Sequence, residues 1–516
     1  MLFNSYEFLF LFLPIALIGF YSLGNKEDKR RAISWLVVVS IFFYAWWNPA
    51  YLLLIGFSIA FNFLTGRLLS KTPSMSLLTL GVSGNVALLA YYKYANFFVD
   101  TFNEFLSRDI ILAEIILPIA ISFFTFQQIA YLVDTYRGDI QKANFLNYCL
   151  FVTFFPQLIA GPIVHHKEML PQFIAKDFSI YRSSNLVIGL TIFFIGLFKK
   201  CVLADGIADY STPVFSQAEQ GIPITFFEGW GGSLAYTLQL YFDFSGYSDM
   251  AIGLGRMFGI MLPVNFLSPY KANNIISFWR QWHITLSRFL REYLYIPLGG
   301  SKNGPVKRYR NLIITMLLGG LWHGAGWNFL IWGALHAGYL VVNHMWRFLP
   351  SILDSRSGKL LLFSPIISRI ITFTAIVFAW VVFRAETIEG AMFVYQGMLG
   401  MNGISIPVQM SSHLTSLQAV FPSLEIEASG LGSFGSPLGV LWIIGLMGLV
   451  WLAPNTTQFM EDSKTNLSIA QDDISLTPAI NYNWRPSKGW SMVMALIATL
   501  SVLSFRQVSE FLYFQF

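Results

Sequence analysis

The chain has 516 residues, of which 55% are hydrophobic and 12% are charged, whereas charged residues make up roughly 25% of a soluble globular domain. So few charged side chains could not cover 49 Phe and 15 Trp residues in water. The composition therefore excludes a soluble enzyme, a nucleic-acid-binding protein and a disordered scaffold, and it indicates a chain whose surroundings are mostly lipid.

The net charge of +5 is concentrated in one segment. Residues 271–310 contain eight basic residues against one acidic residue, Glu292, while the rest of the chain is slightly acidic. The basic residues are Lys271, Arg280, Arg288, Arg291, Lys302, Lys307, Arg308 and Arg310. Such a segment can anchor a chain to anionic lipid, or it can form a mouth that attracts an anionic donor. The sequence leaves both interpretations open.

Long runs without Asp, Glu, Lys or Arg recur along the chain. A membrane helix needs about 20 apolar residues, so we expect an all-α polytopic membrane protein with roughly 11 to 13 transmembrane helices plus re-entrant and interfacial helices. The first long run, residues 32–66, is divided by Trp47-Asn48-Pro49. We divide the chain into N-terminal transmembrane helices (1–110), a central core (111–385) and a C-terminal part of extramembrane loops and transmembrane helices (386–516), all within one integrated membrane domain.

Two features follow in the first half of the core. Residues 154–163 contain two prolines and a glycine, which predict a broken helix or a re-entrant segment. Lys199 and Lys200 end a further uncharged run, and we interpret this pair as a marker of the cytosolic interface.

Two acidic residues, Asp243 and Asp249, come directly after an uncharged run. Residues six apart do not share a helix face, so they are poorly placed for a paired acid and base. We interpret Asp243 as the buried partner of an arginine, which would be a structural role.

Residues 278–293 combine aromatic and basic residues at helical spacing. On one helix, Trp279, His283, Leu286 and Leu290 would share a face. Another face would carry Arg280, Ser287 and Arg291, and this combination is typical of an interfacial or half-inserted helix.

The run from Asn311 to Trp346 contains 36 uncharged residues. As one helix it would be about 54 Å long, nearly twice the hydrocarbon thickness, so it must break. Gly319, Gly320, Gly324 and Gly326 surround His323 and mark the place. Irregular backbone at membrane depth lines a cavity or is buried in protein, so His323 is the candidate functional histidine. The alternative is a core histidine that bonds a neighbouring carbonyl.

Two more histidines, His336 and His344, follow on the next predicted helix. They form no H-x-x-x-H step and have no carboxylate nearby in the sequence, so we predict no metal site. A haem would need a partner from a second helix. An imidazole near its working pH suits general base catalysis, and with a thioester donor this would give acyl transfer to a hydroxyl. A transporter whose histidines relay protons remains the alternative.

Several motifs resemble one family. The sequences F-W-R-Q-W-H (Phe278–His283) and L-W-H-G (Leu321–Gly324), whose histidines are forty positions apart, resemble the membrane-bound O-acyltransferase family. Within it the chain is most similar to the bacterial alginate O-acetyltransferase branch, through F-F-P-Q-L-I-A-G-P-I (154–163), Y-F-D-F-S-G-Y-S-D-M-A-I-G (241–253), R-E-Y-L-Y-I-P-L-G-G (291–300) and F-L-Y-F-Q-F (511–516).

The resemblance implies a helical fold around a membrane-crossing tunnel, with His323 as the catalytic residue. The second family position, usually Asn, Asp or His, falls on His283, whose implied role is to orient the donor or polarise its carbonyl. Trp282 and Trp322 would shape the cavity wall. The predicted substrate-binding residues are Trp282, Trp322, Arg280, Arg288, Arg291 and Asp243, with the arginines on the phosphates of the donor.

The resemblance also implies acetyl-CoA as a donor substrate and no bound cofactor. It implies a multi-pass protein of the bacterial inner membrane that works with periplasmic SGNH-type acetyltransferases and accessory proteins on an exported polysaccharide, alginate first. Membrane lipid is the other expected partner, and nucleic acid is not one. Cellulose, peptidoglycan and teichoic acid remain alternative acceptors.

Overall fold

The fold is helical throughout most of the chain. The computed structural model describes residues 1–24, 28–140, 144–302, 304–347, 364–407, 426–429, 437–460, 483–505 and 512. Within these ranges the exception is a short parallel sheet in which strand β1 (Ile404–Pro407) pairs with β2 (Ile426–Ser429). The predicted helical fold class is confirmed, with this small addition.

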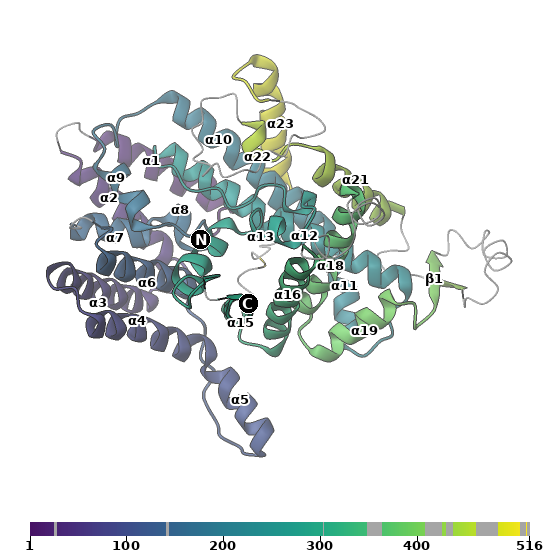
Figure 1. The fold of residues 1–516 in the computed structure, drawn as a ribbon. Helices are drawn as coiled ribbons and strands as arrows, with labels where there is room; N and C mark the ends of the chain where they lie inside the picture. Colours follow the sequence, from purple (N-terminus) through teal and green to yellow (C-terminus); the bar gives the residue numbers. More distant parts are fainter. Residues whose placement is uncertain are drawn as a thin grey trace.

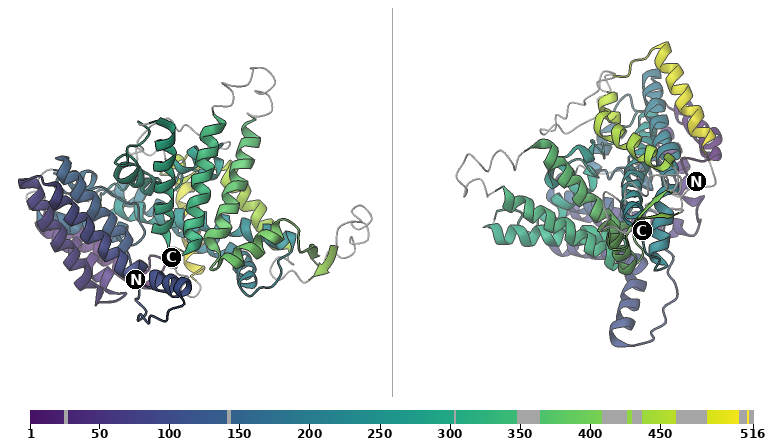
Figure 2. Two further views of the ribbon diagram at one scale, coloured as in Figure 1. Left: turned by 60° about the horizontal axis from the view of Figure 1, so that its bottom comes forward. Right: turned by 90° about the vertical axis from the view of Figure 1, so that its right-hand side faces the viewer.

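Helices from the first 175 residues form one group, coloured purple to blue in Figure 1. Within it, α3, α4 and α6 lie side by side, and α5 projects away from the body (Figures 1 and 2). The elements are η1 (Glu7–Phe12), α1 (Leu13–Ser22), α2 (Arg30–Ala45), α3 (Tyr51–Lys71), α4 (Met75–Leu89), the π-helix η2 (Ala90–Tyr94), α5 (Ala95–Leu106), α6 (Ile121–Arg137), α7 (Phe145–Thr153), α8 (Phe155–Leu158) and α9 (His166–Ile174).

Helix α12 (Phe226–Met257) is the centre of the molecule. It begins with a capping box, in which Thr225 and Glu228 satisfy each other's backbone N–H groups, and it is buried along most of its length. The elements that pack against it include α10 (Ser183–Phe198), η3 (Lys199–Ala204) and α11 (Asp205–Glu219). A helix surrounded by protein in this way can carry polar side chains that lipid would not tolerate.

The backbones of α10 and α12 touch at two glycine pairs. A Cβ added at Gly253 would lie 2.6 Å from the carbonyl oxygen of Gly189, and one at Gly196 would lie 2.4 Å from that of Gly246. Small residues at such positions let membrane helices approach closely. The two pairs fix how α10 lies along α12.

Helices α15 (Gly304–His323), α16 (Trp327–Trp346) and α18 (Pro365–Arg384) stand side by side (Figures 1 and 2). The predicted break in the long uncharged run is confirmed, because α15 ends at His323 and α16 begins at Trp327. The glycines also have a packing role, since a Cβ at Gly320 would lie 2.2 Å from the carbonyl oxygen of Phe329.

Two other predicted breaks and one predicted continuous helix can be compared with the structure. The division at residues 47–49 is confirmed by the gap between α2 and α3, and that at 154–163 by the four-residue α8 and the irregular backbone after it. The single helix predicted over residues 278–293 is wrong. The chain forms α13 (Ile275–Trp279), breaks before α14 (Ile284–Leu290), and continues as the π-helix η5 (Arg291–Tyr295).

The C-terminal part packs onto the same core. Helices α19 and α21 contact α12, and α23 contacts α10. The described elements not yet given are η4 (Pro269–Lys271), α19 (Ile388–Met398), α21 (Pro437–Leu452), α22 (Thr456–Phe459) and α23 (Lys488–Leu503). The predicted extramembrane loops of residues 386–516 lie partly outside the described residues.

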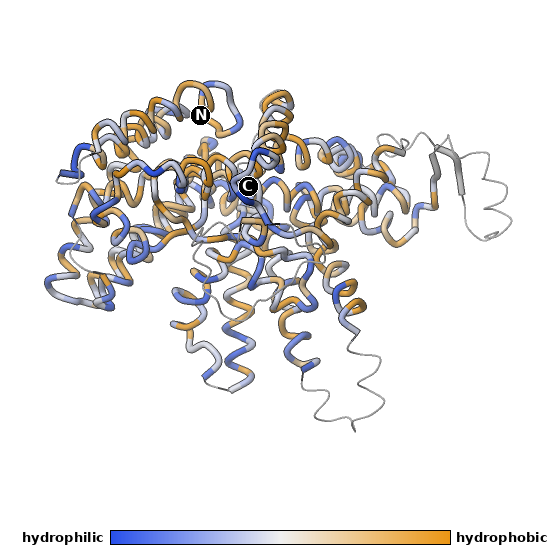
Figure 3. Tube along the Cα trace, turned by 90° about the horizontal axis from the view of Figure 1, so that it is seen from above, coloured by the Kyte–Doolittle hydropathy of each residue, from blue (hydrophilic) through white to orange (hydrophobic). Residues whose placement is uncertain are grey.

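Hydrophobic residues recur along the helices, as Figure 3 shows, and many of the large ones are exposed. Among the described residues, four helical stretches are long and apolar enough to cross a membrane, namely Tyr51–Lys71, Met75–Leu106, Ser183–Glu219 and Pro365–Arg384, and three apolar helices are shorter. The polytopic membrane fold is therefore confirmed. The four long and three shorter apolar helices among the described residues are fewer than the 11 to 13 spans predicted. Many uncharged runs form helices that are short, broken or enclosed by protein.

Candidate active site

His323 is buried at the end of α15 and only 4% exposed. Its ring lies edge-on to the rings of Trp332 on α16, at 4.9 Å between centroids, and Phe383 on α18, at 5.3 Å. The neighbouring Trp322 ring is 5.0 Å away. Three helices thus hold one imidazole in an aromatic enclosure.

The end of α15 is capped by η2, which is more than 220 residues away in the sequence. The Lys93 ammonium donates to the carbonyl oxygens of Trp322 at 2.6 Å and His323 at 3.2 Å. The Tyr94 hydroxyl donates to Leu321 O at 2.7 Å. These bonds satisfy three of the four carbonyls that a helix C-terminus leaves without intrahelical partners. Lys93 is not among the residues predicted from the sequence, although its place directly after the uncharged run 72–92 was an available signal.

A cavity of about 80 Å³ opens at His323. Its polar lining comes from Lys93, Ser122 and His323, and the rest from residues 117–123, Ile159, Ala160 and Trp322. The broken segment 154–163 therefore contributes to the wall of this cavity. Since a site for one water needs roughly 10 to 15 Å³, the cavity has room for only a small group.

His283 lies in the break between α13 and α14, where its backbone is left-handed, with φ of 43°. Its Nδ1 is 3.2 Å from Oδ1 of Asn265, and the same oxygen accepts from the backbone N–H and the hydroxyl of Thr285. Because a backbone N–H can only donate, that Asn265 atom is the oxygen, and the bond requires a proton on Nδ1 of His283. In the neutral ring, Nε2 is then an acceptor.

Trp322 connects the two candidate histidines. Its ring centroid is 5.0 Å from that of His323 and 5.9 Å from that of His283, and Phe126 of α6 stacks against it at 5.4 Å. The structure therefore brings His283, Trp322 and His323 together, as predicted from two motifs forty residues apart.

Trp282 lies in an aromatic layer that adjoins the site. Its ring packs against Trp380 at 5.0 Å and Phe278 at 5.6 Å. His336 joins this layer through Trp332, at 4.7 Å. Trp282 is not among the residues that line the 80 Å³ cavity, so it contributes to the aromatic packing around the site.

The basic segment divides into internal and exposed residues. Arg288 makes two hydrogen bonds to Glu168, at 2.7 and 3.0 Å, and the buried Lys271 donates to Ala453 O at 2.6 Å. Arg280 and Arg291 are exposed. Of the three arginines predicted to bind the donor, only these two present their charge mainly to solvent.

Asp243 is paired with a lysine, so the predicted arginine partner is wrong. Its Oδ1 lies 2.7 Å from Nζ of Lys200, which also donates to Asp205 at 2.8 Å, and its Oδ2 accepts from the backbone N–H of Leu512. Both oxygens are engaged inside the fold, which supports the structural role over substrate binding. Lys200 is correspondingly buried and faces protein, and the position of Lys199 and Lys200 at the cytosolic interface stays a prediction.

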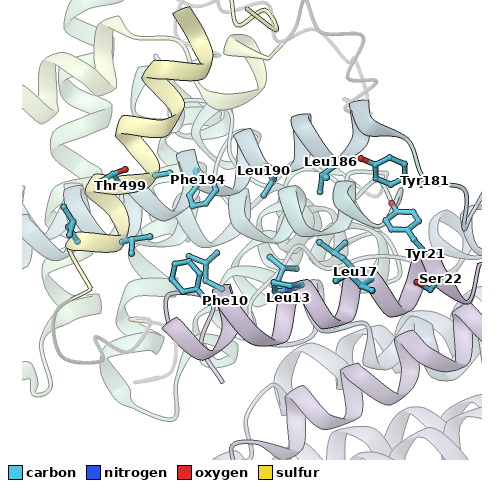
Figure 4. A pocket seen from close by; sticks show the side chains of 16 residues that line it. Phe10, Leu13, Leu17, Tyr21, Ser22, Tyr181, Leu186, Leu190, Phe194 and Thr499 are labelled. Atoms are coloured by element: carbon cyan, nitrogen blue, oxygen red, sulfur yellow. The ribbon is translucent and has the colours of Figure 1, made fainter. Parts of the chain in front are cut away.

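A much larger groove, of about 930 Å³, lies between α1, α10 and α23 (Figure 4). Its lining is almost entirely apolar, with hydroxyl groups from residues such as Tyr21, Tyr181 and Thr499. Among the described residues that line it, none is a lysine, arginine, histidine or carboxylate. These residues therefore offer no general base, whereas the small cavity has His323 in its wall.

The fold and the site together define a helical membrane protein with two histidines held around one tryptophan. A family model described as the membrane-bound O-acyltransferase family matches residues 23–383, which contain both histidines. The chain therefore belongs to the membrane-bound O-acyltransferase family, and it is an acyltransferase.

Similar proteins support this assignment. The chain is 45% identical over 436 residues to a peptidoglycan O-acetyltransferase of Helicobacter pylori, covering 79% of this chain and 81% of the relative. It is 36% identical, over the full length of both chains, to a probable alginate O-acetylase of Pseudomonas putida. A teichoic acid D-alanyltransferase of Streptococcus thermophilus is 27% identical over 44% of this chain and 57% of its own. The resemblance found in the motifs is thus confirmed at the level of the family.

Proposed function

We propose that this protein transfers the acetyl group of cytosolic acetyl-CoA across the bacterial inner membrane for O-acetylation of an exported polysaccharide. The observation that carries the proposal is the small cavity at His323, with Lys93 and Trp322 in its wall. A space of about 80 Å³ suits an acetyl group better than a long acyl chain. The Helicobacter and Pseudomonas putida relatives, each of which covers most of the chain, are named for O-acetyl transfer.

In this scheme His323 is the general base. It takes the proton of the acceptor hydroxyl while the hydroxyl oxygen attacks the thioester carbonyl. The oxyanion then collapses, the carbon–sulfur bond breaks, and the CoA thiolate recovers the proton from the imidazolium. The products are an acetyl ester and free CoA, and the protein is unchanged.

His283 receives a narrower role than the motif resemblance implies. With Nδ1–H directed to Asn265, neutral His283 offers an acceptor at Nε2, so it suits a hydroxyl or a water molecule better than an oxyanion. Polarising the donor carbonyl then requires another donor group.

The acceptor has two candidates. Full-length similarity to the alginate O-acetylase supports alginate, and the higher identity of the Helicobacter protein supports peptidoglycan. In both cases, periplasmic SGNH-type acetyltransferases and accessory proteins would complete the transfer. Measuring base-labile acetate in exported polymer and in isolated cell walls, with and without the gene, distinguishes the two acceptors.

The His323→Ala variant tests the proposal. We expect protein that is folded and inserted in the membrane, with release or transfer of labelled acetyl from acetyl-CoA reduced by roughly 10²- to 10⁴-fold, because the base is lost. His344→Ala is the matched control, since His344 is a partly exposed residue that contacts Arg308. Transfer by the His323 variant at the wild-type rate would contradict the assignment, and a wild-type protein without transfer would favour a transporter.

A further inference from the structure

Lys93 is a cation inside a stretch that the membrane would surround. It lies within Met75–Leu106, one of the helical stretches long and apolar enough to cross a membrane. A charged group is costly at membrane depth, and such residues usually face a cavity and have a function. Lys93 is only partly buried and lines the cavity at His323.

The partners of Lys93 are carbonyls rather than a carboxylate. Its ammonium contacts Trp322 O and His323 O, and within the described residues it has no carboxylate oxygen within 4 Å. The C-terminus of α15 is the negative end of the helix dipole, which stabilises a cation. The positive charge is therefore held at the helix end without being neutralised by a neighbouring acid.

An ammonium group has three N–H donors. Two of them are used by the carbonyls of Trp322 and His323, which leaves one for a ligand in the cavity. The two bonds also hold Nζ at the residue that carries the general base.

We propose that Lys93 is a catalytic residue whose remaining N–H binds the oxyanion formed from the thioester carbonyl. This inference rests on the proposed function and adds the group that it lacks, since neutral His283 presents an acceptor. When the hydroxyl oxygen bonds to the carbonyl carbon, the electron pair of the C=O bond moves to the oxygen, and Lys93 stabilises that charge until the thiolate leaves. A fixed donor of this kind typically contributes about 10²- to 10³-fold in rate.

The test compares Lys93→Gln, Lys93→Arg and Tyr94→Phe in purified, full-length protein with labelled acetyl-CoA. Glutamine keeps N–H donors for the helix carbonyls but removes the charge, so we expect kcat to fall about 100-fold, with the KM for acetyl-CoA changed by less than about threefold. Arginine keeps the charge, so we expect the kcat of Lys93→Arg to be at least tenfold higher than that of Lys93→Gln. Tyr94→Phe removes only a cap on Leu321 and should stay within about threefold of wild type.

Two outcomes would overturn the inference. One is a kcat for the folded glutamine variant within a few-fold of wild type. The other is an equal loss in the glutamine and Tyr94→Phe variants, which would show that helix capping alone matters. If the glutamine variant does not fold, Lys93→Met serves in its place, judged against the same limits. The proposed function is tested separately. It holds if the wild-type protein transfers acetyl from acetyl-CoA and the His323→Ala variant does not, whatever the result at Lys93.

Discussion

Lys200 and Asp243 illustrate how a charge is accommodated in this core. Their side chains are 4% and 1% exposed and lie 2.7 Å apart. Burying an ion pair is costly, and its net contribution to stability can be small. Removing Lys200 leaves the buried Asp243 carboxylate without its paired cation, whereas removing Asp243 leaves Lys200 paired with Asp205. The pair joins η3 to the middle of α12, so its loss would affect the centre of the fold.

At this residue scale, we expect Lys200→Met to lower the free energy of unfolding by about 3 to 5 kcal/mol, because the buried Asp243 carboxylate loses the lysine with which it pairs. The double variant Lys200→Met/Asp243→Asn should recover part of that loss, because neither buried charge remains at the pair. Thermal unfolding of the detergent-purified proteins measures both effects. If the two substitutions lowered the free energy of unfolding additively, so that the double variant was less stable than the single variant, the two buried charges would not be stabilising each other.

At the scale of elements, the glycine contacts between α10 and α12 allow a sharp test. A Cβ at Gly253 would meet the carbonyl oxygen of Gly189 and the backbone nitrogen of Phe193, both at 2.6 Å. Backbone atoms cannot rotate away, so we expect Gly253→Ala to destabilise the protein by about 1 to 3 kcal/mol.

The control for this substitution is Gly338→Ala on α16, where an added Cβ would have nothing within 4 Å. Alanine there should be neutral or slightly stabilising, because alanine has a higher helix propensity than glycine. Melting temperatures in the same detergent compare the two variants. Equal shifts for both would mean that close packing of α10 on α12 is not responsible.

Breaks between elements could be predicted from the sequence, because their causes are local. The uncharged run from Asn311 to Trp346 exceeds the membrane thickness, and its glycines mark where the helix ends. The break at His283 could not be predicted in this way. No glycine or proline lies between Ile275 and Leu290, and the left-handed turn is held by Asn265, which is distant along the chain.

The site could be predicted only in part for the same reason. Both histidines lie in short motifs, whereas Lys93 and Asn265 act through contacts that only the folded chain creates. The basic segment 271–310 could likewise be recognised by counting charges in the sequence. Its division into Arg288, which pairs with Glu168, and Arg291, which is exposed, depends on the fold. Local patterns thus identify the reacting groups, and the folded chain supplies their partners.

At the scale of the whole molecule, the C-terminal part is integrated with the core. Asn455 donates to Ser268 at 3.0 Å, Lys271 donates to Ala453 O, and Thr456 donates to Asp249 at 2.6 Å. Together with the packing of α21 on α12 and α23 on α10, these bonds connect residues after 386 to the elements that hold the site.

We therefore expect a chain truncated after residue 385 to lose its monodisperse, folded form in detergent. Without α19, α21 and α23, the faces of α10 and α12 that these helices cover would become exposed. Several buried hydrogen bonds would also be lost. Size-exclusion chromatography and acetyl transfer measure the outcome. A stable and active 1–385 fragment would show that the matched family region folds on its own.

The left-handed backbone at His283 limits how its mutants can be interpreted. Asn, Asp and His are the non-glycine residues that most readily adopt positive φ, and they are also the residues that the family resemblance implies at this position. Backbone tolerance is therefore one physical reason for that restricted choice. Alanine at residue 283 would combine a lost imidazole with a strained peptide, whereas asparagine changes the side chain and keeps the turn. Kinetic comparisons at this position separate chemistry from folding only when the replacement is matched in conformation.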